Sequence, residues 1–293
     1  KTDIKVNDIS FLISTRNNGN RLKVVYDNIR KFYKQNYIVI VSDASTDNTH
    51  TILNELNSND DKLISFCSAE RLNFAKAYNK TIELCPTDLF CFFHDDTFVS
   101  ENFIENLIKH IHNKKSFVCF STCEPPIFHQ QDEIGKPIKD FGRDYLNLNL
   151  DDFYLFSKGY CNENKDKTFS FNGGFFMCGY IETIKQVGLF DTIFYPHFSE
   201  DSDLLHRLII NGCNFILSLD SLIYHIPSST SRFSDEFKDT IRTTDLNGQR
   251  NFLRKWHTLW AVIQDFNNMG IKYEKFNCKI ILDNTRLDIL SNI

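Results

Sequence analysis

The sequence predicts an α/β protein in which helices cover both faces of a mostly parallel β-sheet. Short runs rich in β-branched and aromatic residues alternate with longer amphipathic segments through the first third of the chain. The chain has 293 residues, of which 42% are hydrophobic and 24% are charged, enough to enclose one large domain or two small ones. Strands that alternate with helices of this length pair in parallel, because each helix returns the chain to the same end of the sheet.

The first βαβ unit is predicted over residues 8–43. The runs "DISFLIST" and "NYIVIVSD" at its two ends have the composition of buried strands. Between them, the apolar residues of "NRLKVVYDNIRKFYKQ" recur three and four positions apart, which predicts a helix with one buried face.

The same alternation continues as far as residue 96. The further predicted elements are a helix over 45–57, a strand over 62–68, a helix over 74–85 and a strand over 88–96. Ser45 or Asp47 would cap the first of these helices, because their side-chain oxygens can accept hydrogen bonds from the first free amides.

The fourth strand, "DLFCFFHDD", ends in three residues that a core cannot accept unpaired, His94, Asp95 and Asp96. Ligands of parallel α/β sheets gather at the carboxyl ends of the strands. The chain lacks both GxGxxG after its first strand and the P-loop pattern, so a bound phosphate would need another source of positive charge. A divalent cation on one aspartate would supply it, while the other aspartate turns towards a sugar hydroxyl and His94 lies on the same side as Asp96. A solvated turn is the alternative.

Charge and cysteine content argue against several classes of function. The net charge is −5 and no segment concentrates the basic residues, so we expect no nucleic-acid partner. The apolar runs are too short to span a bilayer and no signal-peptide pattern opens the chain, so we expect no transmembrane segment. Nine cysteines without a CxxC pair indicate reduced thiols and therefore a reducing, cytoplasmic compartment.

A later segment, "FSEDSDLLHRL", predicts a helix start rich in carboxylates. Ser199 would be the N-cap, with Glu200, Asp201 and Asp203 in the first turn, where the helix dipole stabilises negative charge and the side chains would project into a cleft. Asp201 is our candidate for a base that accepts a hydroxyl proton in a concerted step. Acidic residues also occur at helix starts for the dipole alone, which is the structural alternative.

Taken in order, the motifs of residues 8–232 resemble those of the inverting GT-A glycosyltransferases of family 2. "ISTRNNGNRL" resembles the opening strand and nucleotide loop of that family, and "VSDASTDNT" resembles its "VDDGSTDGT". "FFHDDTFV" is similar to the DxD-type metal motif, with His94 in place of the leading Asp. "NGGFFMCGYIETIKQVGLFDTIFYPHFSEDSDLLHRL" follows the acceptor half, and "SLIYHIPSSTS" resembles the segment that brings a histidine to the metal. The family's "NxGxAxAxN" is replaced by "RLNFAKAYN", a departure at Arg71 and Asn73.

The resemblance implies roles for individual residues. Asp96 and His225 would bind the metal, and Asp201 would be the catalytic base. The residues expected to bind the nucleotide part of a donor are Thr15, Arg16, Asn18, Asp43 (at the nucleobase), Ser45, Arg71, Asp95 (at the ribose) and Arg232 (at a phosphate oxygen). The residues expected to contact the donor or acceptor sugar are Gly173, Gly174 and Glu200. A tight turn would also explain the two glycines, and a hydrogen-bonded core position would also explain His225.

The predicted domains are a GT-A domain over 1–232 and a mainly helical C-terminal extension over 233–293. Within the first, residues 1–115 form the nucleotide-binding half and 116–232 the acceptor half. In the extension, "CKIILD" is a candidate strand and Trp256 is expected to pack against the first domain.

Residues 124–168 predict a long connection rich in aromatic and charged residues. Long loops on a rigid scaffold often carry specificity. The aromatic rings would either stack on an acceptor sugar or, as the default, close a subsidiary core.

These observations predict a metal-dependent inverting glycosyltransferase that moves one sugar from a nucleotide-diphosphate sugar to an acceptor hydroxyl. Its cofactor would be Mn²⁺ or Mg²⁺, and UDP-sugar is favoured over dTDP and GDP donors. Glycans, lipids and proteins are all compatible acceptors. The sequence is compatible with any oligomeric state of the protein itself. The alternatives are a non-catalytic nucleotide- or sugar-binding protein on the same fold, or a two-carboxylate glycosidase that uses Asp96 and Asp201. A processive synthase is disfavoured because "QRNFLRKW" does not reproduce QxxRW.

Overall fold

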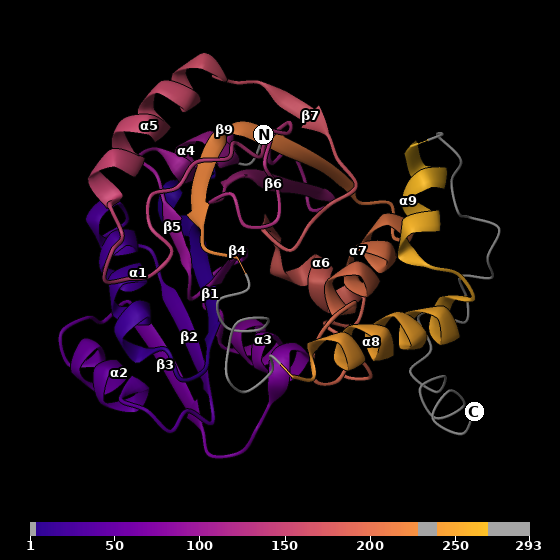
Figure 1. Cartoon of the computed structure of the whole chain (residues 1–293), viewed down its shortest axis with the longest axis horizontal. Helices are drawn as coiled ribbons and strands as arrows, with labels where there is room; N and C mark the ends of the chain where they lie inside the picture. Colours follow the sequence, from indigo (N-terminus) through magenta and orange to yellow (C-terminus); the bar gives the residue numbers. More distant parts are fainter. Residues whose placement is uncertain (1–3, 228–238, 269–293) are drawn as a thin grey trace.

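The computed structural model describes residues 4–227 and 239–268 (Figure 1). Within these ranges the strands form one sheet in the order β3-β2-β1-β4-β8-β6-β9-β5, with β7 also paired to β9. The strands are β1 Ile9–Thr15, β2 Ile38–Asp43, β3 Leu63–Ser68, β4 Leu89–His94, β5 Thr97–Val99, β6 Ser116–Cys123, β7 Thr168–Ser170, β8 Met177–Tyr180 and β9 Asn214–His225. The α-helices are α1 Gly19–Phe32, α2 Thr49–Asn57, α3 Asn73–Leu84, α4 Phe103–Ile108, α5 Leu150–Glu163, α6 Ile181–Gln186, α7 Glu200–Ile210, α8 Ile241–Trp256 and α9 Trp260–Asn268.

The first half of the sheet confirms the predicted βαβ alternation. Strands β3, β2, β1 and β4 pair in parallel, and the helices between them are those that the apolar spacing predicts. The second half is mixed, because β8 is antiparallel to both β4 and β6. The short strands β5 and β7 are antiparallel to different parts of the long strand β9, whose last residues reach the carboxyl end of β4.

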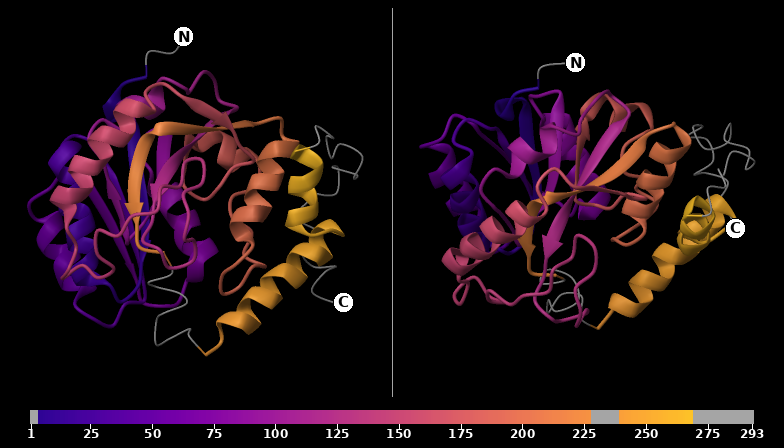
Figure 2. Two further views of the ribbon diagram at one scale, coloured as in Figure 1. Left: turned by 45° about the horizontal axis from the view of Figure 1, so that its top comes forward. Right: turned by 90° about the horizontal axis from the view of Figure 1, so that it is seen from above.

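Both faces of the sheet are buried, as the apolar strands predict. In β4, Cys91 and Phe93 pack into the apolar layer under α1, α4 and α5, whereas Phe90 and Phe92 pack into the layer under α3, α6 and α7. This alternation follows from the two-residue period of a strand. The helices on both faces hold the carboxyl ends of the strands in fixed positions (Figures 1 and 2).

The N-cap residue of α2 is Asn48, whose side chain makes no capping hydrogen bond, and of the two predicted caps only Asp47 accepts an amide of the first turn. Asp47 accepts the amide of Thr49 at 3.0 Å and, with its other oxygen, the amide of Gly19 at 3.1 Å. The hydroxyl oxygen of Ser45 instead accepts the amide of Asn17 at 3.0 Å. Asp47 therefore links the first turns of α1 and α2 and sets the position of the loop between β1 and α1.

The prediction of a long connection over 124–168 is wrong in one respect, because it contains the helix α5. Asn149 accepts the amide of Asp152 and so caps the helix, and its aromatic side chains at 153, 156 and 160 recur at helical spacing. Phe141 and Phe153 are buried in the main core and Tyr154 and Tyr160 pack against it, so these rings extend the main core and do not close a subsidiary one, whereas Phe128 is 44% exposed.

The C-terminal helices α8 and α9 lie alongside α7 (Figures 1 and 2). Phe252 and Trp256 of α8 are buried against Phe194, as expected for Trp256. The candidate strand "CKIILD" lies outside the described residues. In the ranges that the structure covers, no helix is long and apolar enough to cross a bilayer.

Candidate active site

Strand pairing brings His225 to the carboxyl end of β4. The chain turns at Asp95 and Asp96 into β5, whose first residue, Thr97, is paired with His225 of β9. The amide of Ile226 donates to the backbone oxygen of Asp96 at 3.1 Å. Asp96 and His225, which are 129 positions apart in the sequence, therefore become neighbours through the three-residue strand β5.

His94, Asp96 and His225 form a candidate metal site, with one ligand atom from each within 4.8 Å of the others. Asp96 Oδ1 lies 3.6 Å from Nε2 of His225 and 3.9 Å from Nδ1 of His94. Partial burial lowers the pKa of His94 to about 4, so at neutral pH its imidazole is in the uncharged form that binds metals. Two imidazole nitrogens and one carboxylate fit a divalent transition metal such as Mn²⁺. The sequence prediction included Asp96 and His225, and the structure adds His94.

Glu124 is a site residue that the sequence prediction missed. Its Oε1 lies 2.8 Å from Nδ1 of His225, and both side chains are only 11% exposed. Burial raises the pKa of Glu124, but the hydrogen bond and charge of His225 outweigh it and hold this pKa below its usual value. The pairing of Cys123 with Tyr224 places the next residues, Glu124 and His225, side by side. A carboxylate on the far nitrogen turns Nε2 towards Asp96 and fixes the tautomer, as in many metal sites.

Aromatic rings form one wall of this group. The ring of Phe175 lies 4.3 Å from that of His94, and the ring of Phe176 lies 4.9 Å from that of His225. This apolar wall limits the orientations open to both imidazoles.

Asp95 joins the end of β4 to the loop that follows β1. Its Oδ2 accepts from Thr15 at 2.6 Å and from Asn18 at 3.1 Å. Arg21, which the sequence analysis did not single out, donates to Oδ1 at 3.1 Å and to the backbone oxygen of Asp95 at 2.9 Å. Asp95 is only 2% exposed, so it holds the β1–α1 loop in place in addition to its expected contact with a ribose.

Asp43, which is predicted to bind the nucleobase, lies at the end of β2 against the start of α3. It accepts the amide of Asn73 at 3.0 Å and Nε of Arg71 at 3.2 Å. Arg16 crosses from the neighbouring loop to the backbone oxygens of Asp43 and Ala44. The described members of the predicted nucleotide set thus lie on adjoining loops at the carboxyl ends of β1, β2, β3 and β4. Arg232 lies outside the described residues.

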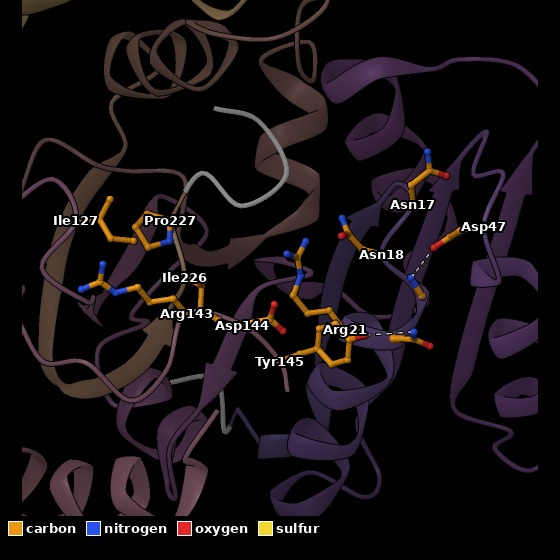
Figure 3. Close-up of a pocket in the computed structure, with 12 residues that line it drawn as sticks. Asn17, Asn18, Arg21, Asp47, Ile127, Arg143, Asp144, Tyr145, Ile226 and Pro227 are labelled. Carbon is orange, nitrogen blue, oxygen red and sulfur yellow. Dashed lines mark hydrogen bonds between the residues drawn. The ribbon is translucent and has the colours of Figure 1, made fainter. Parts of the chain in front are cut away.

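A pocket of about 570 Å³ opens beside these loops (Figure 3). Residues 17–21 line it, and so do Arg143, Asp144 and Tyr145 from the connection before α5, of which Tyr145 accepts a hydrogen bond from Nδ2 of Asn20 at 3.4 Å. Ile226 and Pro227, which directly follow His225, also line it. The pocket therefore adjoins both the β1–α1 loop and the residues that follow the candidate metal ligand His225.

The three carboxylates predicted at the start of α7 lie in its first turn, and none of them is among the described residues that line the pocket beside the β1–α1 loop. Glu200 is 5% exposed, and burial raises its pKa well above the usual value. Asp201 is partly exposed and accepts the amide of Ser202 at 2.7 Å; burial raises its pKa as well. Ser199 is the N-cap residue of α7, as predicted, although its side chain makes no capping hydrogen bond.

The prediction that Asp203 projects into the cleft is wrong. Asp203 is fully buried and accepts from Nε of Arg207 at 2.9 Å, Nζ of Lys255 and Nε1 of Trp256, the last two at 2.8 Å. Burial raises its pKa, but the two cations outweigh this and hold the pKa below its usual value. Residues two apart on a helix point in different directions, so Asp203 faces α8.

Tyr78 of α3 is buried against the end of β4. Its hydroxyl donates to the backbone oxygen of Phe93 at 2.6 Å. Burial raises the pKa of Tyr78, and the charges of Asp95, Asp96 and Glu200 raise it further. The amide of Phe74, at the start of α3, donates to the backbone oxygen of Pro196 in the segment before α7.

Gly173 and Gly174 lie between β7 and β8. Gly173 has φ +90°, and a Cβ there would come within 2.5 Å of Leu205 of α7 and 3.1 Å of Phe215 of β9. The positive φ favours a glycine at 173 whether or not a sugar binds there, and its sugar contact remains a prediction.

The model of glycosyl transferase family 2 matches residues 10–160, just over half of the chain. The chain belongs to this family. No curated protein matches it in sequence. Two solved glycosyltransferases share its fold. The first is the mannosyltransferase PcManGT from Pyrobaculum calidifontis in complex with GDP-Man and Mn²⁺, with TM-score 0.53, 16% identity, and 78% of this chain and 61% of that one covered. The second is GalNAc-T7 with UDP, GalNAc and Mn²⁺, with TM-score 0.59 and 13% identity; the match covers 97% of this chain and 57% of that one.

These comparisons confirm the GT-A fold and the family 2 membership. The chain spans about three fifths of the length of each of the two structures.

Proposed function

We propose that this family 2 protein is a metal-dependent, inverting glycosyltransferase that transfers one sugar from a nucleotide-diphosphate donor to an acceptor hydroxyl. The observation that carries the proposal is the meeting of His94, Asp96 and His225 beside the loops after β1 and β2. A UDP-sugar is favoured as donor. The solved structure with the higher TM-score holds UDP and the other holds GDP-Man, which keeps GDP-sugars as the principal alternative.

In this proposal each group has a separate task. Asp96 and His225, with His94, would hold a Mn²⁺ or Mg²⁺ ion, which as a Lewis acid neutralises the charge of the departing diphosphate. Asp43 and Arg71 would hold the nucleobase. The rest of the nucleoside would be held by Thr15, Arg16, Asn18, Ser45 and Asp95. Gly173, Gly174 and Glu200 would contact a sugar.

Asp201 would accept the proton of the acceptor hydroxyl as that oxygen attacks the anomeric carbon. An aspartate is a far weaker base than an alkoxide, so the proton transfer must accompany bond formation. Attack from the face opposite the leaving diphosphate gives inversion. We further propose that residues 1–232 form the GT-A domain and 233–293 its extension.

A thermal-shift panel of UDP, GDP, dTDP and their sugar conjugates, with and without Mn²⁺, tests the donor and the metal together. A ligand at about 100 times its Kd stabilises the fold by about 2.7 kcal/mol, which is about 5–10 °C for a domain of this size. Asp96→Ala is expected to remove the part of the shift that depends on Mn²⁺.

Asp201→Asn is expected to keep that shift and to lose turnover by a factor of about 10²–10⁴. Asp151→Asn is the matched control, because Asp151 also lies in the first turn of a helix but is exposed on α5. Turnover that persists in the chelator-treated enzyme would favour a glycosidase, and nucleotide binding without turnover would favour a binding protein. The anomeric configuration of the product, read by NMR, tests inversion.

A further inference from the structure

Helix α8 packs along the segment that leads into α7. This segment, residues 191–199, connects the end of α6 to the first turn of α7, and Figures 1 and 2 show α8 beside α7. Asn251 donates to the backbone oxygen of Ile193 at 3.0 Å. Phe252 and Trp256 close an apolar cluster with Phe194 of the segment.

Gly248 permits the closest approach between α8 and this segment. A Cβ at Gly248 would lie 2.6 Å from the backbone oxygen of Phe198 and 3.0 Å from its carbonyl carbon. Real Cβ atoms do not come this close to backbone atoms, and a backbone group cannot rotate away as a side chain can. Any larger residue at 248 would therefore push α8 and the 198–199 turn apart.

The turn that meets Gly248 has an unfavourable backbone. Phe198 has φ 83° and Ser199 has φ 70°, two successive non-glycine residues in the left-handed region. Such conformations persist only where the surrounding structure holds them. The direction of the first turn of α7, and hence of Glu200 and Asp201, depends on this pair.

Two charged contacts fasten the other end of α8. Lys255 lies between Asp191, at 2.5 Å, and Asp203, at 2.8 Å, so one ammonium group joins the beginning of the segment to α7. Nε1 of Trp256 donates to the same oxygen of Asp203 at 2.8 Å. Asp203 is fully buried and lies only two residues beyond Asp201.

We propose that α8 is a positioning element for catalysis: Gly248, Lys255 and Trp256 hold residues 191–199 and the first turn of α7, and thereby fix the catalytic carboxylate. The inference rests on the proposed function, since it concerns the placement of Asp201. None of the three residues needs to touch a substrate. Their removal should change the rate of the chemical step while the metal and nucleotide sites stay intact.

The physical part of the proposal is tested by hydrogen–deuterium exchange of backbone amides in Gly248→Ala, Lys255→Met and Trp256→Phe. Exchange is expected to accelerate at least tenfold for amides of 191–205 and to stay unchanged in β1, β2 and β4. Gly159→Ala is the matched control for the glycine variant, because Gly159 also lies within a helix but a Cβ there meets nothing within 4 Å. Arg250→Met is the control for the lysine, since it removes an exposed cation from the same helix.

The catalytic part is tested by kinetics with the donor identified in the thermal-shift panel. A misplacement of about 1 Å costs about 100-fold in rate, so kcat is expected to fall about 10- to 100-fold while the Mn²⁺-dependent shift given by UDP or GDP stays at the wild-type value. Lys255→Arg keeps a cation between the two carboxylates and is expected to retain most of the kcat.

Folded variants whose 191–205 exchange equals that of the wild type would overturn the inference. Faster exchange with unchanged kcat would overturn it as well. If the wild-type protein bound no nucleotide and turned over no donor, the proposed function would fail, whereas the exchange experiment would still decide whether α8 holds the segment.

Discussion

Replacing Glu124 tests the metal site through a residue that binds no metal itself. The carboxylate lies 2.8 Å from Nδ1 of His225 and is 11% exposed, so its hydrogen bond to the imidazole is screened little by water. Partners of this kind orient the ligand ring and raise its basicity, and their loss typically lowers metal affinity by about 10- to 100-fold. This corresponds to about 1.4–2.7 kcal/mol of binding free energy.

Glu124→Gln can still accept a hydrogen bond but carries no charge, so we expect a loss of Mn²⁺ affinity near tenfold. Glu124→Ala removes the acceptor as well, and the loss should approach 100-fold. The assay is a calorimetric Mn²⁺ titration at a fixed, saturating nucleotide concentration, with circular dichroism to confirm the fold.

Glu133→Gln is the matched control, because Glu133 pairs with His129 at 3.3 Å but is 59% exposed. An exposed pair of this kind contributes little, so Mn²⁺ affinity should stay within about twofold of wild type. Wild-type affinity in both Glu124 variants would refute the reasoning, since His225 would then need no partner or would bind no metal.

Three further predictions concern stability and the β1–α1 loop. Asp203→Asn leaves two buried cations without their carboxylate and is expected to lower the free energy of unfolding by about 3–5 kcal/mol, measured by urea denaturation. Burial lowers the pKa of His206 to about 4, below the usual value near 6.5, so only the unfolded chain takes up this proton as the pH falls through that window. The histidine therefore lowers the free energy of unfolding by almost nothing above pH 7 and by about 2 kcal/mol at pH 5. In His206→Gln, the free energy of unfolding should change less with pH over that range. Arg21→Ala removes two of the donors that hold Asp95 and is expected to weaken UDP or GDP binding at least tenfold in the thermal-shift assay, whereas the exposed Arg250→Met should leave it unchanged.

The local features of the site could be predicted from the sequence because they depend on short-range patterns. An apolar strand that ends in Asp95 and Asp96, and a helix that begins with Glu200 and Asp201, are visible within a few residues of the chain. Position in the first turn does not by itself specify the direction of Asp203, since it lies two residues from Asp201 but three from Glu200, a spacing that shares a helix face. Helix α5 carried a usable signal in the cap at Asn149.

The contacts between distant segments could not be predicted in this way. The two-residue period of a strand shows which side chains share a face, but it does not show which strand lies alongside or in what register. The hydrogen bond between Glu124 and His225 joins residues 101 positions apart and exists because β6 and β9 pair at one particular register. The bond between Trp256 and Asp203, 53 positions apart, requires that α8 dock on α7.

By itself, the sequence determined the alternation of strands and helices, the burial of both sheet faces and the strand and helix ends that carry carboxylates, since backbone period and local polarity specify these. Only the tertiary structure decided that His94 joins Asp96 and His225, that Arg21 holds Asp95, and that Asp203 faces α8. Each of these depends on the packing and register of elements far apart in the chain, for which local patterns carry no information.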